Sequence, residues 1–244
     1  MAFLGLAQYQ QTRQKSETFD PNWWAILNLA LFLLARPFQE NEKILIKPSN
    51  VANNLAAEVL ESPVTGKLLL LYSPLQRFLV SVLSGGGERM ETLNKLFSEI
   101  IRDHQDQLPL EFHEIGFLPP LKKMALMWGL QVKQFSELAR SKPGGPVKTL
   151  DCEVFLEHPK ETLGKLFKFF EIEISPSEIK AIVKGQGFKT DSKIKEAGFS
   201  RKEWDLRKEE ILKAEKTKIK EALRFAEDLG FPIAGNLPAG LLSD

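Results

Sequence analysis

This sequence has few cysteines and histidines and no large excess of charge of either sign. Its 244 residues include one cysteine, Cys152, and three histidines, His104, His113 and His158. A single cysteine excludes an internal disulfide framework and a cysteine-based zinc site, and the histidines lack metal-ligand spacing. Lys and Arg number 33 against 32 Asp and Glu, a formal net charge of +1. That balance excludes a strongly basic nucleic-acid-binding protein.

A hydrophobic run long enough to cross a membrane is also missing. The longest apolar run, 23–35, is interrupted by Asn28 and falls short of the roughly 20 residues of a spanning helix. We expect a buried core helix there, and the alternative is a membrane-docking or partner-docking helix. Residues 1–7 have no basic segment and too short an apolar stretch for a secretory signal. With the single cysteine, these features favour a cytoplasmic protein without a membrane span.

What is present is the pattern of a globular α/β protein, with 43% hydrophobic and 27% charged residues. Short apolar runs predict buried strands at 43–47, 67–72 and 147–151. Amphipathic patterns predict helices at 51–61, 74–83, 88–107, 120–140, 157–170, 175–184 and 200–229. Strands followed by helices predict a parallel sheet. The last helix is densely charged, which favours a solvent face or an oligomer contact, and 231–244 is expected to be a loosely held tail.

Familiar catalytic and nucleotide-binding motifs do not occur. Gly66-Lys67 is the nearest approach to a Walker loop, but Glu61 and Leu68 replace its first glycine and its hydroxyl residue, and a strand follows rather than a helix. No G-x-G-x-x-G fingerprint opens a helix, and no G-x-S-x-G elbow is found. Cys152, near the end of a predicted strand, is expected to be a small buried residue.

Polar side chains gather where two predicted strands lead into helices. Ligands of open α/β sheets bind beyond the carboxyl ends of strands, where helix N-termini favour anions. The first junction carries Lys47, Ser49 and Asn50, and the second carries Ser73, Arg77 and Ser81. These residue types suit a phosphate or sulfate, and the alternative is that Ser49, Asn50 and Ser73 are merely helix caps.

A third cationic stretch, 180–195, has five lysines opposed inside it only by Asp191. Two interpretations stay open for it. The stretch, which includes Lys193, is either a solvated surface run or a loop that folds over a polyphosphate ligand.

The segment 43–83, KILIKPSNVANNLAAEVLESPVTGKLLLLYSPLQRFLVSVL, resembles the sulfotransferase family, which uses 3′-phosphoadenosine 5′-phosphosulfate (PAPS). The family carries there an apolar strand ending in Tyr-Arg-x-Pro and a helix with Val-Ser. The segments 150–172 and 188–193 are similar to its acidic turn, its following helix and its late lysine-bearing loop. The likeness spans about 40–195 and is closest to a group of bacterial sulfotransferase-like proteins.

The resemblance implies roles for individual residues. Ser81 matches the family serine that binds the 3′-phosphate of PAPS, but the arginine expected eight positions earlier falls on Ser73. Arg77, one helical turn from Ser81, is the substitute, and Lys193 lies where a late basic residue approaches the same phosphate. The remaining junction residues, which would face the reacting centre, are Lys47, Ser49 and Asn50. No phosphosulfate loop is found before residue 40, so the catalytic residues are unassigned.

The resemblance therefore implies a three-layer α/β/α, P-loop NTPase-like fold, helix-rich and lacking its first strand. We expect one sulfotransferase-like domain over 1–244, with its core at about 20–195. The implied function is sulfuryl transfer from PAPS, without a metal, to an unidentified acceptor by a truncated or inactive relative. The alternative is a non-catalytic scaffold or interaction protein that retains the fold, and a homo-oligomer fits either hypothesis.

Overall fold

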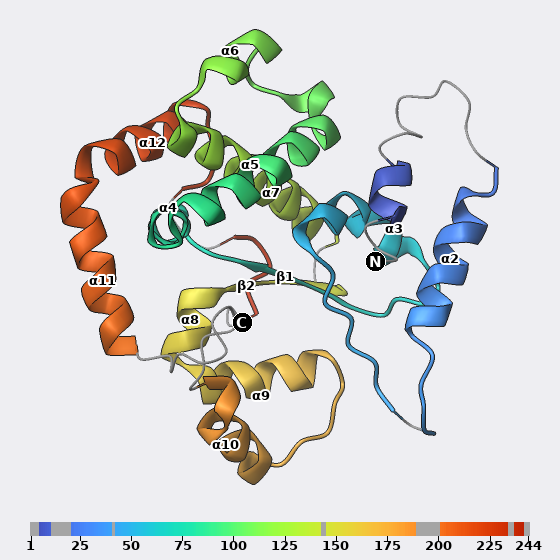
Figure 1. Ribbon diagram of the computed structural model, residues 1–244. Coiled ribbons are helices and arrows are strands. Elements are labelled where there is room, and N and C mark those ends of the chain that lie inside the picture. Colours follow the sequence, from blue (N-terminus) through green and yellow to red (C-terminus); the bar gives the residue numbers. More distant parts are fainter. Residues whose placement is uncertain are drawn as a thin grey trace.

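A two-stranded parallel sheet lies within a helix-rich α/β arrangement (Figure 1). The computed structural model describes residues 5–10, 21–40, 42–142, 145–188, 201–233 and 237–241. The longer helices are α2 (Trp23–Leu34), α4 (Leu75–Ser84), α5 (Gly86–Asp103), α7 (Pro120–Ser141), α9 (Pro159–Phe169), α10 (Pro176–Lys184), α11 (Arg201–Ala214) and α12 (Lys216–Asp228). The shorter ones are α3 (Ala56–Glu61), α6 (Phe112–Phe117), α8 (Cys152–Glu157) and the 3₁₀ helices η1 (Asn50–Leu55), η2 (Gln105–Gln107) and η3 (Gln186–Phe188).

The two strands are β1 (Leu68–Tyr72) and β2 (Val147–Asp151), and both confirm the apolar runs that predicted them. They pair in parallel without offset, from Leu68 opposite Val147 to Tyr72 opposite Asp151. Because the register aligns their last residues, the chain leaves both strands at the same edge of the sheet. We call this the carboxyl edge.

The prediction of a strand at 43–47 is wrong. Residues 43–49 have no secondary structure, and Leu45 and Ile46 are 56% and 39% exposed. The apolar, β-branched pattern of this segment suits a strand, but a strand also needs a hydrogen-bonded neighbour. Among the described residues none pairs with this segment, so the sheet has two strands rather than the three expected.

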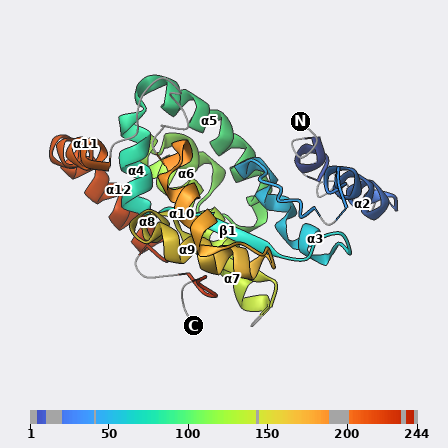
Figure 2. The same cartoon turned by 90° about the horizontal axis from the view of Figure 1, so that it is seen from below.

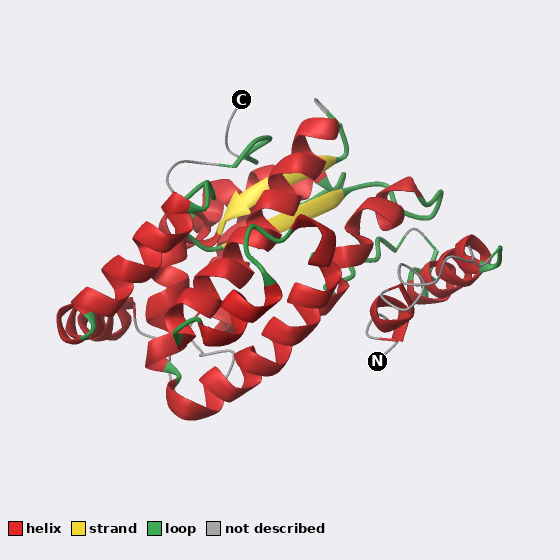
Figure 3. Ribbon diagram, turned by 90° about the horizontal axis from the view of Figure 1, so that it is seen from above, coloured by secondary structure: helices red, strands yellow, loops and turns green. Residues whose placement is uncertain are grey.

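Helices lie on both sides of the sheet and bury most of the apolar side chains. In Figure 1, α4, α5 and α7 lie above the strands and α9 and α10 below them, and Figures 2 and 3 show the same arrangement from below and above. Helix α7 is the central element, because twelve of its residues are buried against the surrounding elements. Its first residue is Pro120, a position where proline's missing N–H costs no helical bond.

The final charged segment is broken into α11 and α12 at Glu215. Helix α12 buries Ile219, Ala222 and Ala226, which belong to the same apolar core as α7. The charged face of this segment is therefore exposed as expected, but its other face is a structural part of the core.

The expectation of a loosely held tail is wrong for 231–233 and 237–241. Phe231, Leu237 and Leu241 are buried. The N–H of Thr149 donates to the carbonyl of Ala239 at 3.0 Å, and the N–H of Leu241 donates to the carbonyl of Thr149 at 2.8 Å. The second edge of β2 has backbone groups that need partners, and the tail supplies them.

Candidate functional site

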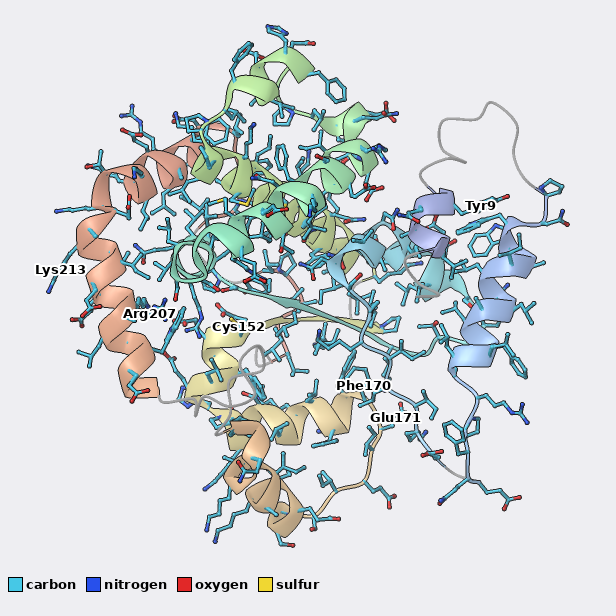
Figure 4. The ribbon with its side chains drawn as sticks, in the orientation of Figure 1. Tyr9, Cys152, Phe170, Glu171, Arg207 and Lys213 are labelled. Carbon is cyan, nitrogen blue, oxygen red and sulfur yellow. The ribbon has the colours of Figure 1, made fainter. Side chains whose placement is uncertain are left out.

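The carboxyl edge is where the sequence placed a candidate anion site, and two helices begin there. Helix α4 begins at Leu75, three residues after β1, and α8 begins at Cys152, directly after β2. Figure 4 labels Cys152 at this junction, with α11 facing it from the other side of the edge.

Local sequence explains both where helix α8 begins and where it ends. The Asp151 side chain is its N-cap, since Oδ1 accepts the backbone N–H of Glu153 at 2.8 Å. At the other end, Pro159 disfavours helical backbone at His158, which adopts φ −124° and ψ 54°. The expected helix over 157–170 is therefore two helices, α8 and α9, and the short α8 holds Glu153 beside α4.

The guanidinium of Arg77 forms an ion pair with the Glu153 carboxylate in this edge. The two side chains are 13% and 20% exposed, so water screens the pair only partly. On its other side the guanidinium lies 5.4 Å from the ring centroid of Trp204, a cation–π contact from α11. Lys208, one turn along α11, places Nζ 3.9 Å from the second oxygen of Glu153.

Burial changes the proton affinity of two further groups at this edge. Desolvation raises the pKa of Asp151 above the usual carboxyl range, although Arg77 acts in the opposite direction. Desolvation also raises the pKa of Tyr72, whose Oη accepts the backbone N–H of Leu237 at 3.3 Å. Both groups therefore favour their neutral forms more than they would in water.

The structure keeps the second predicted set on one segment. Ser73, Arg77 and Ser81 all lie on α4 or its approach, and all three are half-buried. The backbone carbonyl of Ser73 accepts a hydrogen bond from Trp128 Nε1 of α7 at 2.7 Å. Ser73 does not cap α4, because Pro74 occupies the N-cap position. The cap interpretation of Ser73 is therefore wrong, whereas its phosphate-binding role stays a prediction.

The first predicted set lies elsewhere on the surface. Lys47, Ser49 and Asn50 are exposed and lead into η1 rather than leaving a strand. Ser49 is at the N-cap position of η1 but makes no side-chain capping bond.

Helix α7 shows how the two sets are separated. Just after the first set, the carbonyl of Asn53 accepts from Gln134 Nε2 at 3.0 Å. The second set contacts α7 at Trp128, which is six residues, or about 9 Å of helix, away from Gln134. Lys193, the remaining predicted residue, lies outside the described residues.

Sequence reasoning missed Glu153, Trp204 and Lys208, the residues that surround Arg77. A signal for Glu153 was present, because strands predicted at 67–72 and 147–151 in one parallel sheet must end at one edge. Acidic residues just after the second strand are therefore expected to lie near the cation that follows the first strand. Nothing local in the sequence marks Trp204 and Lys208, which reach this edge through the packing of α11 against α4.

The described residues give no further support for a ligand site at the predicted residues, either as a surface hollow or as a metal-binding cluster. Surface hollows of about 290 and 310 Å³ are formed by 157–161 and by residues of α5 with Gln105 and Phe112. Neither is lined by Ser73, Arg77 or Ser81. In the part of the chain that is described, no three His, Cys, Asp or Glu side chains form a group able to hold a metal ion. None of the described helices combines the length and apolar character needed to cross a bilayer.

Comparison with family models, with curated proteins and with solved structures found no match to this chain. The assignment of function therefore depends on the site itself. At the carboxyl edge, the positive charges of Arg77 and Lys208 face the carboxyl groups of Asp151 and Glu153. A phosphate group arriving there would meet carboxylates as well as cations, and would have to displace Glu153 from Arg77.

Proposed function

We propose that this chain is a non-catalytic interaction protein that retains a sulfotransferase-like α/β scaffold. The observation that carries the proposal is the enclosure of Arg77, the cation nearest to Ser81 on α4, by Glu153 and Trp204. A guanidinium that binds phosphate needs its N–H fork directed at the ligand. Here that fork is paired with a carboxylate of the chain's own α8.

The balance of charge supports the same conclusion. A nucleotide 3′-phosphate carries close to two negative charges, and a binding site for it needs an excess of positive potential. Arg77 and Lys208 are the cations in contact with Glu153, and the neighbouring Asp151 adds a second carboxyl group. An ion pair between partly buried side chains costs several kcal/mol to break by removing one partner. A phosphate that replaced Glu153 would keep Arg77 paired but would leave the partly buried Glu153 carboxylate without that cation, and phosphate binding would have to offset this loss.

The second candidate function is sulfuryl transfer from PAPS, in the P-loop NTPase-like fold that the resemblance implies. One observation favours it: Arg77 and Ser81 are four residues apart in α4 and therefore share a side of the helix that follows β1, and Ser73 lies just before that helix. In that function they would hold the 3′-phosphate, with Lys193 approaching it and Lys47, Ser49 and Asn50 nearer the sulfuryl group. In-line transfer depends on positioning and on stabilising the non-bridging oxygens, and no described residue is assigned as its base.

Calorimetric titration of the full chain with adenosine 3′,5′-bisphosphate separates the two candidates. The proposal predicts no saturable heat. ADP, which lacks the 3′-phosphate, is the matched control ligand, because it reports binding that does not involve Ser81.

Two variants complete the design, Ser81→Ala and Arg77→Gln. Saturable binding of the bisphosphate that exceeds ADP binding and is lost in either variant would overturn the proposal and establish the nucleotide site. An absence of saturable heat with both ligands, in the wild type and in the variants, is the result expected if Arg77 stays enclosed.

A further inference from the structure

The outer face of α2 is apolar and exposed along its whole length. At 100° per residue, Leu29, Phe32 and Leu33 lie on the side opposite the buried Trp23, Leu27 and Leu31, and Ile26 lies at the edge of that side. We call the four exposed residues, Ile26, Leu29, Phe32 and Leu33, the outer stripe. They are 41%, 59%, 61% and 59% exposed, and Phe38, just beyond the helix, is 95% exposed. The expectation of a buried core helix is therefore correct for one face and wrong for the other.

The inner face of α2 is fixed, so the outer stripe has a defined orientation. Trp23, Leu27 and Leu31 pack into a small apolar cluster with Leu55, separate from the main core. The Oδ1 atom of Asn28 accepts a hydrogen bond from the Ser62 hydroxyl at 2.6 Å. Figures 1 and 2 place α2 at the periphery of the molecule, beyond η1 and α3. The helix cannot turn its outer stripe inward without giving up these contacts.

The area of this surface fits an interface. Half-exposed side chains of this size present about 100 Å² each, and the almost fully exposed Phe38 presents about 200 Å². The outer stripe with Phe38 therefore offers roughly 600 Å² per copy, which is at the upper limit for the largest apolar patch of a typical monomer. Two copies facing each other would bury about 1,200 Å², the lower end of the range for specific interfaces.

The charges around the surface decide between occupants. The outer stripe carries no charge, and the charged residues that follow α2 are Arg36, Glu40, Glu42 and Lys43, which cancel. A surface of this kind offers no attraction to anionic lipid, which binds clusters of basic residues. It likewise offers nothing to a strongly charged protein. An uncharged apolar patch is complementary to itself, as a twofold interface requires.

We propose that a second copy of this chain covers the outer stripe, forming a twofold dimer through α2. This inference rests on the proposed function, because it names the partner of an interaction protein. The two can fail separately. Nucleotide binding at Arg77 would overturn the proposed function and leave the dimer intact, whereas a monomeric chain would overturn the dimer alone.

Sedimentation equilibrium over a range of protein concentrations tests the dimer. The test variant is Leu29→Gln with Leu33→Gln, because glutamine is a good helix former and α2 stays intact. Each substitution enters a twofold interface twice, so we expect the dissociation constant to rise on the order of 1,000-fold. The matched control is Leu206→Gln, a residue that is similarly exposed at 54% and belongs to α11, the helix on the opposite side of the molecule from α2 in Figure 1. Circular dichroism confirms that each variant is folded.

A dimer that the double variant abolishes and Leu206→Gln preserves supports the proposal. A wild-type chain that stays monomeric, or a dimer that survives the double variant, overturns it. Flotation with neutral phosphatidylcholine vesicles covers the lipid alternative. Vesicle binding by a monomeric wild-type chain, lost in the double variant, would assign the outer stripe to a membrane surface instead and would also overturn the dimer.

Discussion

At the scale of single residues, the candidate site is defined by what already contacts Arg77. The sequence offers a cation one turn from Ser81, as an anion site needs, and the same sequence supplies Glu153 and Trp204 from two other helices. Residue type and spacing on α4 therefore predict that Arg77 can bind an anion, but in the folded chain Glu153 and Trp204 already contact its guanidinium. The neighbouring Asp151 experiences the same partly buried environment, and its titration gives a measurable consequence.

We predict that Asp151→Asn raises the free energy of unfolding above that of the wild type, and that this gain is larger at pH 7 than at pH 4. Burial raises the native pKa of Asp151 above its unfolded value of about 3.9. A carboxyl group with a raised native pKa lowers stability once it ionises, and this effect disappears as the pH falls through the native value toward the unfolded one. Asparagine keeps the cap of α8 without the charge. Urea unfolding of both proteins at both pH values measures the difference.

Comparing variant and wild type at the same pH cancels the titration of groups that do not interact with Asp151. A stability difference that is equal at the two pH values, or smaller at pH 7, would mean that the pKa of Asp151 is not raised. The assignment of Asp151 to a partly buried edge would then be wrong.

At the scale of elements, the close approach of α7 to the segment after α12 decides how the C-terminal region is held. Gly129 lies in the middle of α7, and a Cβ atom built on it would overlap Cδ2 of the Phe231 ring. Glycine weakens a helix by about 1 kcal/mol relative to alanine. Its presence here is explained by the buried Phe231 side chain that packs against the bare backbone.

We therefore predict that Gly129→Ala destabilises the protein by about 1–3 kcal/mol, the usual cost of overpacking, despite alanine's higher helix propensity. Gly164→Ala in α9 is the matched control, because its added Cβ would meet only Ile179 Cδ1 at an ordinary 3.8 Å. That control should be neutral or stabilising by up to about 1 kcal/mol. Urea unfolding measures both. Equal effects of the two substitutions would contradict the packing of Phe231 on α7.

At the scale of the whole molecule, the sequence predicted elements better than it predicted their partners. The apolar runs of β1 and β2 and most helices are where local patterns placed them, and α10, expected at 175–184, begins with a capping box of Ser175 and Glu178. The run at 43–47 has the same local pattern but forms no strand, since pairing depends on a neighbour that local pattern does not specify.

The same distinction applies to the candidate site and the tail. Arg77 and Ser81 lie on the helix predicted to follow the strand at 67–72, whereas the contacts of Arg77 come from residues 76 and 127 positions later in the chain. The tail contacts β2 through backbone bonds to Thr149, which no side-chain pattern in 237–241 indicates. Whether the chain forms one domain over 1–244 stays a prediction.

The central claim is that this molecule gains stability from a second copy of itself and none from a nucleotide. Thermal unfolding of the full chain tests it directly when the midpoint is followed against protein concentration and against millimolar adenosine 3′,5′-bisphosphate. A ligand at about 100 times its Kd stabilises by about 2.7 kcal/mol, which is roughly 5–10 °C for a protein of this size. We predict a midpoint that rises with protein concentration and does not change with the nucleotide. A midpoint that is independent of protein concentration and rises by several degrees with the bisphosphate would contradict the account.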